Sequence, residues 1–307
     1  QFTIELANKG ITVLGIGQEP YEQLDEPLRN SLTEYFRVDN LENVDEVKRA
    51  AAFLFYKHGP IDRIESHNEY WLELDATLRE QFNVFGAKPE DLKKTKFKSE
   101  MKKLFKKAGV PVVPGAVIKT EADVDQAVKE IGLPMIAKPD NGVGAAATFK
   151  LETEDDINHF KAEWDHSTIY FFEKFVTSSE ICTFDGLVDK DGKIVFSTTF
   201  DYAYTPLDLM IYKMDNSYYV LKDMDPKLRK YGEAIVKEFG MKERFFHIEF
   251  FREGDDYIAI EYNNRPAGGF TIDVYNFAHS LDLYRGYAAI VAGEEFPASD
   301  FEPQYCL

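Results

Sequence analysis

The chain has 307 residues, 44% hydrophobic and 29% charged, a balance typical of a globular protein with two or three packed units. Its 54 acidic and 36 basic side chains give a formal net charge of −18, which argues against a general binder of nucleic acid or of an anionic membrane surface. Two cysteines, Cys182 and Cys306, exclude a disulfide framework and a thiolate metal cluster. This cysteine usage fits a reducing, cytoplasmic setting best. No apolar run of membrane-spanning length and no signal peptide are visible.

The first 90 residues alternate strand and helix patterns. Helices are expected at 2–10, 26–35, 43–58 and 69–82, and strands at 11–17, 36–39 and 61–66. This order predicts a parallel sheet with crossover helices, a Rossmann-like unit over residues 1–90. Because such a layout calls for a strand before the first helix, we expect residues upstream of the chain, and a further C-terminal piece remains open.

Ligands of open parallel sheets bind at the carboxyl ends of the strands. The third expected strand is IDRIES, so Glu65, His67 and Asn68 mark a candidate substrate edge. Ordinary surface or packing is the alternative. The glycines at 15–17 do not extend into a GxGxxG pattern, which argues against dinucleotide binding.

The composition changes near residue 90, where a basic helical stretch, KPEDLKKTKFKSEMKKLFKKAG, ends on a glycine before two prolines. Strands are then expected at 115–119, 134–139, 148–151 and 169–176, and helices at 121–131 and 153–164. These elements predict a small α+β unit over residues 91–176. The Gly/Ala loop NGVGAAAT follows Lys138, so a cation stands beside backbone N–H groups that could approach phosphates. A plain glycine-rich connection is the alternative.

The last unit, residues 177–307, begins with β-patterned sequence. A hairpin is expected at 181–200, a helix at 226–239, a second hairpin near 246–263 and a final helix at 273–292. The second hairpin, FHIEFFREGDDYIAIEYNN, turns near Asp255. If the loop is centred there, residues whose numbers sum to 510 face each other, so Glu249 lies opposite Glu261 and His247 opposite Asn263.

The two faces of this hairpin are expected to differ in polarity. Period two continues the polar side from Glu261 to Arg265. The other side is expected to pack on a core and carries Ile248, Phe250, Ile258, Ile260 and Tyr262. Two carboxylates directly across a ladder repel each other and favour a cation, and oxygen ligands suit Mg²⁺. A purely structural glutamate pair is the alternative.

These features occur in a particular order: a basic helix, a strand lysine with its glycine loop, the strand FFEKFVTSSE, and the stretch IEYNNRPAGG. In this order the sequence resembles the ATP-grasp superfamily, in particular its carboxylate–amine ligase branch, with modules related to carbamoyl phosphate synthase and L-amino-acid ligases. The resemblance covers essentially the whole chain. It implies an α/β and α+β architecture in which two subdomains, at 91–176 and 177–307, clasp ATP behind a Rossmann-like domain.

The resemblance implies how the phosphates of ATP would be held. Lys98 would be the first ATP lysine, with the lysines of 94–96 as alternatives, and Lys138 the second, on the α- and β-phosphates. Gly142 and Gly144 would lie in the mobile phosphate loop. Alanines stand where many relatives have a serine in that loop, so backbone groups would have to make the phosphate contacts.

The strand FFEKFVTSSE would hold the adenosine. Glu173 would take the adenine amino group, and Glu180 the ribose hydroxyls. The backbone along the adenine edge would come from Lys174, Phe175 and Val176. An edge strand with alternating charge is the alternative.

The hairpin would hold the metal and the reacting groups. Glu249 and Glu261 would ligate Mg²⁺, with Glu261 bridging two ions and Asn263 completing the second, and Mn²⁺ could substitute. Arg265 would clamp the transferring phosphoryl group or the acyl phosphate, together with the charge of Lys138.

The implied reaction has two steps: a carboxylate takes the γ-phosphoryl group of ATP, and an amine then displaces phosphate. Gly268, Gly269 and Asp273 are the candidate substrate residues of the last unit, beside Tyr202 and Tyr204. Small carboxylates and amines would be the partners, and a homodimer is common among relatives. An ATP-grasp kinase and a non-catalytic ATP-binding module are the alternatives.

Overall fold

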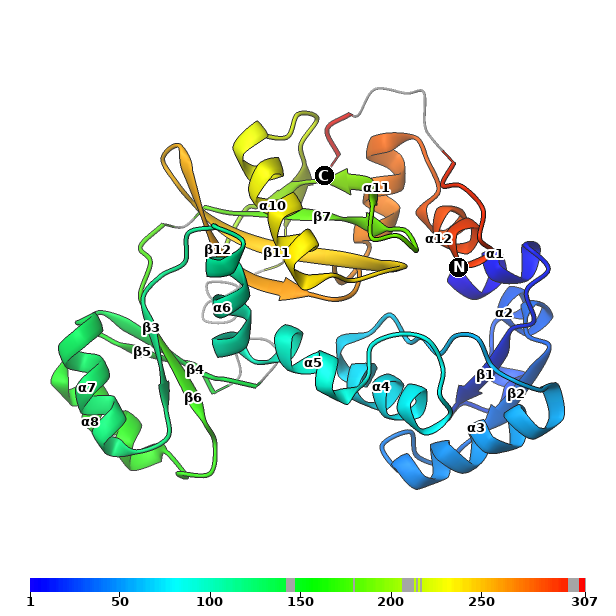
Figure 1. Cartoon of the computed structure of the whole chain (residues 1–307), viewed down its shortest axis with the longest axis horizontal. Coiled ribbons are helices and arrows are strands. Elements are labelled where there is room, and N and C mark those ends of the chain that lie inside the picture. Colours follow the sequence, from blue (N-terminus) through cyan, green and yellow to red (C-terminus); the bar gives the residue numbers. More distant parts are fainter. Residues whose placement is uncertain are drawn as a thin grey trace.

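Three sheets organise the protein, for which the computed structural model describes residues 1–141, 147–178, 180–205, 213, 215, 217–297 and 304–306 (Figure 1). The first sheet has two parallel strands, the second four antiparallel strands, and the third six antiparallel strands. No described helix combines the length and apolar character needed to cross a membrane.

The N-terminal unit alternates strands and helices as expected, but it holds fewer strands. Its elements are α1 (Phe2–Asn8), β1 (Leu14–Gly17), η1 (Tyr21–Gln23), α2 (Glu26–Ser31), β2 (Glu34–Arg37), α3 (Val44–His58), η2 (Glu69–Trp71) and α4 (Leu72–Gln81). Strands β1 and β2 are parallel, and Tyr35, expected to end a helix, pairs with Gly15 instead. Helix α3 begins where the Asn43 side chain accepts the Glu46 N–H.

The strand expected at 61–66 is wrong, because the described backbone there joins no ladder. The Ile64 carbonyl instead accepts a hydrogen bond from Arg79 Nε at 2.9 Å. Arg79 is fully buried, so its guanidinium takes the place that a neighbouring strand would fill. The parallel sheet is therefore narrower than the sequence pattern predicts.

The four-stranded sheet confirms the expected order of elements. It is built from β3 (Gly115–Ile118), α7 (Glu121–Ile131), β4 (Met135–Pro139), β5 (Phe149–Leu151), α8 (Glu154–Glu163) and β6 (Tyr170–Lys174), with strand order β3-β6-β4-β5. Both helices begin at capping boxes, Thr120 with Asp123 and Thr153 with Asp156. Their apolar faces share one core with the sheet, and Figure 1 shows them side by side on it.

The six-stranded sheet is covered on both faces. Its elements are β7 (Ile181–Val188), β8 (Ile194–Thr198), β9 (Phe200–Tyr202), β10 (Tyr218–Val220), α10 (Pro226–Phe239), β11 (Arg244–Glu253), β12 (Asp256–Asn263), α11 (Thr271–His279) and α12 (Leu283–Val291). Helix α10 packs in one core with α6 (Lys98–Lys107), which follows α5 (Pro89–Lys96). Helices α11 and α12 pack in the other. Helix α6, expected to open the small unit, thus packs on the large sheet.

The expected final helix at 273–292 is two helices. Ser280 adopts a left-handed backbone (φ 48°) and ends α11, and the Asp282 side chain then accepts the Arg285 N–H at 3.0 Å to begin α12. The Asn276 side chain accepts the Leu283 N–H and joins the two. An aspartate inside an otherwise apolar periodic stretch was the signal for this break.

Candidate functional site

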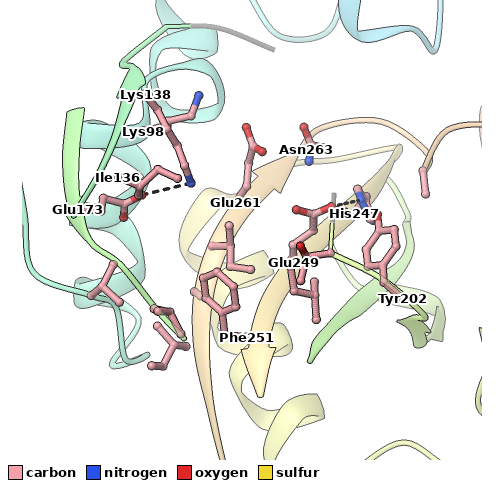
Figure 2. Close-up of a pocket in the computed structure, with 18 of the residues that line it drawn as sticks. Lys98, Ile136, Lys138, Glu173, Tyr202, His247, Glu249, Phe251, Glu261 and Asn263 are labelled. Atoms are coloured by element: carbon pink, nitrogen blue, oxygen red, sulfur yellow. Dashed lines mark hydrogen bonds and ion pairs between the residues drawn. The ribbon is translucent and has the colours of Figure 1, made fainter. Parts of the chain in front are cut away.

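A cavity of about 780 Å³ lies between the small sheet and the β11–β12 hairpin of the large sheet. Its walls come from α6, β4, β6, β11 and β12, and from the segment that leads into α11. Figure 2 shows Lys98 and Lys138 on one side of this cavity, Glu249 and Glu261 in its middle, and His247 and Tyr202 on the far side. Most of the expected site residues meet here.

The hairpin forms the floor of the cavity with the expected facing pairs. Glu249 pairs with Glu261, and His247 with Asn263. The turn, however, is the two residues 254–255, and the ladder shifts by one residue between Glu249 and Phe250. The extra residue on β12 is a β-bulge that restores the inner register.

The bulge reverses the side-chain pattern of the outer hairpin. Tyr257 and Ala259 face the core, while Ile258 and Ile260 line the cavity, so the expected core face was wrong for these two isoleucines. A bulge makes two consecutive residues share one face. Ile260 therefore stands beside Glu261 on the cavity side.

The two facing carboxylates differ in their surroundings. Burial and the charge of Glu249 raise the pKa of Glu261, against the opposing effect of Lys98. Burial acts on Glu249 as well, but bonds from His247 and Tyr202 bring the pKa of its carboxyl below the usual range. The His247 pKa itself rises to about 10, because the carboxylates of Asp185 and Glu249 outweigh burial.

This donor set suits a hard divalent cation completed by other oxygens. Within the described ranges no group of three or more His, Cys, Asp or Glu is arranged to hold a metal ion. What the hairpin offers is two carboxylates and the amide of Asn263, which is 9% exposed. Mg²⁺ is often held by one or two carboxylates together with phosphate oxygens. The raised pKa of Glu261 marks a position where a cation would relieve repulsion.

The opposite wall carries the lysines. Lys138 Nζ, from β4, lies 3.7 Å from Glu173 Oε2, and Lys102 Nζ, from α6, lies 2.9 Å from Glu173 Oε1. Lys98 also lines the cavity, whereas Lys94 donates to the Phe239 carbonyl, which favours Lys98 as the first ATP lysine. Lys96 lines the cavity but pairs with a surface glutamate.

The Glu173 carboxylate contacts both of these lysines. The sequence analysis expected it to bind the adenine amino group instead. Burial alone would raise its pKa, yet Lys102 and Lys138 hold it below the usual range. Lys102 also donates to the Ala259 carbonyl at 2.9 Å, which joins α6 to the hairpin. The sequence analysis missed Lys102, although its position one helical turn after Lys98 was a signal.

Residues 128–273 match the family model of the ATP-grasp domain. The chain carries an ATP-grasp domain. A curated relative, the L-arginine-specific L-amino acid ligase of Bacillus subtilis, is 25% identical over 252 residues, which are 75% of this chain and 59% of that protein. The chain thus spans about three fifths of this relative's length.

Solved structures share the fold. The L-amino acid ligase from Bacillus licheniformis aligns with a TM-score of 0.73 and 14% identity, over 94% of this chain and 70% of its own. The biotin carboxylase domain of the Hydrogenobacter thermophilus 2-oxoglutarate carboxylase, solved with MgADP, ADP and bicarbonate, aligns with a TM-score of 0.73 and 18% identity, over 99% and 70%. The expected ATP-grasp architecture is confirmed.

The strand expected to hold adenosine lines the ATP-grasp cavity through Lys174, Phe175 and Val176. The Lys174 side chain donates to the carbonyls of Gly132 and Leu133, and is thereby turned into the small unit. Its backbone N–H donates to Pro114. The phosphate-loop glycines Gly142 and Gly144 lie outside the described residues.

The structure places Glu180 away from the cavity wall. Its side chain is 66% exposed, and its carboxylate lies 3.7 Å from Arg252 Nη1. Ser178 lines the cavity instead, with its hydroxyl donating to the Arg252 carbonyl at 2.7 Å. The carboxylate is therefore engaged in a surface ion pair, and the ribose contact expected of Glu180 stays a prediction.

Arg265 lines the other end of the ATP-grasp cavity, with Gly268 and Gly269. Arg265 Nε donates to Glu69 Oε2 at 2.9 Å, and Nη1 donates to the Pro266 carbonyl at 2.8 Å. Among the described residues Glu69 is the one contribution of 1–90 to the cavity wall, and the sequence analysis missed it.

The other substrate candidates of the first unit are occupied by structural contacts. Glu65 lies 3.0 Å from Arg79 and 2.8 Å from Arg244. His67 stacks on Phe2, with ring centroids 4.3 Å apart, and burial lowers its pKa to about 4. Asn68 accepts the N–H of Tyr70 at the start of η2. These three residues line no part of the cavity. Residues 1–90 reach it at Glu69, one residue beyond the expected edge.

The remaining substrate candidates differ in whether they line the cavity. Tyr202 lines the cavity and donates its hydroxyl to Glu249 Oε1 at 3.0 Å. Tyr204 is exposed, and Asp273 accepts the Tyr284 hydroxyl at 3.2 Å outside the cavity lining. Tyr202 is thus the expected residue that joins the metal-ligand candidates.

Proposed function

We propose that this chain is the ATP-dependent part of a ligase that activates a carboxylate as an acyl phosphate, releases ADP, and joins the acid to an amine. The observation that carries the proposal is the direct pairing of Glu249 with Glu261 on the floor of a cavity that Lys98 and Lys138 also line. The 25% identical relative is named an L-amino acid ligase, which supports an amino acid as one substrate.

The residues of the floor would hold Mg²⁺. Glu249, Glu261 and Asn263 offer carboxylate and amide oxygens, and a second ion or Mn²⁺ would use the same set. Bound Mg²⁺ would neutralise phosphate charge where the phosphoryl group is transferred. Lys98 and Lys138 would take phosphate oxygens from the opposite wall, since both line the same cavity.

The nucleobase would rest on the apolar part of the cavity. Ile136, Phe251 and Ile258 line it, and the backbone of 174–176 follows its edge. This region meets the carboxylates at Ile260 and Glu261, so an apolar base and a charged phosphate chain would lie in sequence along β12.

Arg265 would stabilise the phosphoryl group in transfer and the acyl phosphate. Its guanidinium is held by Glu69 and by the Pro266 carbonyl, so it need not reorganise during the reaction. Gly268 and Gly269 would let the backbone approach the carboxylate substrate. The small sheet would act as the lid that keeps water from the acyl phosphate.

Product analysis tests this function. The protein is incubated with Mg·ATP and pairs drawn from a panel of amino acids and other carboxylates and amines, and ADP, phosphate and coupled product are measured. ADP and phosphate formed only with both an acid and an amine support the ligase. A stable phosphorylated product from one substrate indicates a kinase, nucleotide binding without turnover indicates a non-catalytic module, and AMP with pyrophosphate contradicts all three.

The same proposal covers the setting of the enzyme. Small carboxylates and amines would be its partners, and it would work in the cytoplasm, in line with the two free cysteines. We also propose a homodimer. Light scattering coupled to size-exclusion chromatography would give twice the chain mass of 35.3 kDa if this is right, and a single chain mass if it is wrong.

A further inference from the structure

A buried histidine stands directly behind the candidate metal ligand Glu249. His247 lies two residues before it on β11, and the nitrogens of its ring face two different carboxylates. Nδ1 lies 2.6 Å from Asp185 Oδ1, and Nε2 lies 3.3 Å from Glu249 Oε1. A carboxylate oxygen only accepts, so the ring donates in both directions. Figure 2 shows His247 and Tyr202 together on the Glu249 side of the cavity.

Asp185 fixes the end of this hydrogen-bonded series that lies away from Glu249. It is 1% exposed, and besides the imidazole it accepts the hydroxyls of Thr183 and Tyr275. The Phe200 ring lies nearly parallel to the imidazole, with centroids 6.0 Å apart. Strand β7, helix α11 and strand β9 therefore all contribute to fixing the orientation of one ring.

The restraint reaches a single oxygen of Glu249. Oε1 receives both the His247 Nε2 contact and the Tyr202 hydroxyl, at 3.3 and 3.0 Å. With Oε1 held from behind, the carboxylate is fixed about its side-chain torsions, and Oε2 is the oxygen left for the cavity. No comparable bond to the Glu261 carboxylate is present among the described residues.

We propose that His247 is a positioning residue that holds Glu249 in its metal-binding orientation, an inference that rests on the proposed metal site. A ligand already fixed loses little side-chain entropy when the ion binds. Outer partners of metal ligands typically contribute about 10–100-fold to metal affinity. The alternative is a purely structural histidine, which only donates a hydrogen bond to the buried Asp185.

Two substitutions separate these roles, since each keeps one arm of the imidazole. In His247→Asn the amide nitrogen takes the place of Nδ1, so Asp185 keeps its donor and Glu249 loses one. In His247→Gln the amide nitrogen takes the place of Nε2, so Glu249 keeps its donor while the buried Asp185 loses one. The two variants differ by one methylene and are matched in charge.

The experiment measures Mn²⁺ binding in the presence of ADP, by titration calorimetry or electron paramagnetic resonance, beside the thermal unfolding midpoint of the metal-free protein. We expect His247→Asn to bind Mn²⁺ about 10–100-fold more weakly with an unfolding midpoint near that of wild type. We expect His247→Gln to keep affinity within about threefold of wild type but to unfold at a lower temperature, because Asp185 is left short of a donor.

This crossed pattern supports the positioning role. Wild-type affinity in His247→Asn, or affinities that simply follow the unfolding midpoints, would overturn it while leaving the metal site intact. If wild-type protein with ADP binds no Mn²⁺, the metal site of the proposed function fails, and the inference fails with it. Should His247→Asn not fold, Tyr275→Phe loosens Asp185 without touching the imidazole; weaker Mn²⁺ binding then supports the inference, and unchanged binding overturns it.

Discussion

The two walls of the cavity manage their charges in different ways. On the lysine wall one buried acid, Glu173, serves two lysines, so positive charge remains in excess. On the hairpin floor two acids face each other, and a histidine and a tyrosine bind only one of them, Glu249. Each wall therefore carries a charge that a ligand of opposite sign would complete. The lysine wall calls for phosphates, and the floor for a cation.

Substitutions on the hairpin floor should lower turnover more than substitutions on the lysine wall. We expect Glu261→Gln to lower turnover by at least about 10³-fold, because the amide cannot supply the anionic oxygen that holds a cation against the phosphates. Stability should stay the same or rise, since the substitution removes a carboxylate whose pKa is raised by burial and by the charge of Glu249. ADP release and thermal unfolding measured on the same preparation check this. Wild-type turnover in the variant would contradict the metal site.

On the lysine wall, we expect substitution of the buried acid to lower the stability of the protein. In Glu173→Gln the buried Lys102 loses its charged partner, so we expect the free energy of unfolding to fall by about 3–5 kcal/mol. The double variant Glu173→Leu with Lys102→Met removes both charges and should regain most of that loss. Denaturant titration of the two variants tests this, and equal stabilities would show that the pair is not the source.

The excess charge of the lysine wall predicts an effect on nucleotide binding. Lys138→Met keeps the apolar stem and removes the ammonium, and we expect ADP to bind about 10–150-fold more weakly, corresponding to about 1.5–3 kcal/mol for a hydrogen bond to a charged group. Lys103→Met is the matched control, since Lys103 lies on α6 but is 68% exposed and outside the cavity lining. Equal losses in both variants would argue for a general charge effect.

A smaller effect is expected outside both walls, where burial lowers the pKa of His67 to about 4. It concerns the free energy of unfolding and its dependence on pH. A base with a depressed pKa contributes stability that is present above its unfolded pKa of about 6.5 and is lost as pH falls toward 4. We expect wild type to lose about 2 kcal/mol more than His67→Phe between pH 7.5 and pH 5. Urea titrations at both pH values test this, and parallel losses would contradict it.

The sequence predicted those parts of the site that depend on local periodicity. Facing glutamates follow from a short turn and period two, and the capping residues of α7 fix its limits in the sequence itself. The bulge at Ile260 could not be predicted, because nothing in a run of alternating isoleucines marks which one is extra. Its effect on the register was offset by the turn, so the Glu249–Glu261 pairing was predicted from a loop centre that was wrong by half a residue.

Long-range contacts account for most of the other differences. The buried guanidinium of Arg79 replaces a strand at Ile64, and the ion pair with Arg252 draws Glu180 to the surface. Lys102 and Glu69 reach the cavity through packing between units that are distant in the chain. A pattern of neighbouring residues carries no information about such partners, so these positions needed the three-dimensional structure.

The bulge on β12 separates the hairpin into two zones with independent phase. The inner zone contains the facing pairs Glu249–Glu261 and His247–Asn263, whereas the outer zone runs from the Phe250–Ala259 pair to the turn at 254–255. Exchanging the outer zone for another hairpin tip of matched length should therefore reshape the apolar wall proposed for the nucleobase while leaving the proposed metal ligands Glu249, Glu261 and Asn263 in place. The proposed base and metal subsites could thus be altered separately on a single pair of strands.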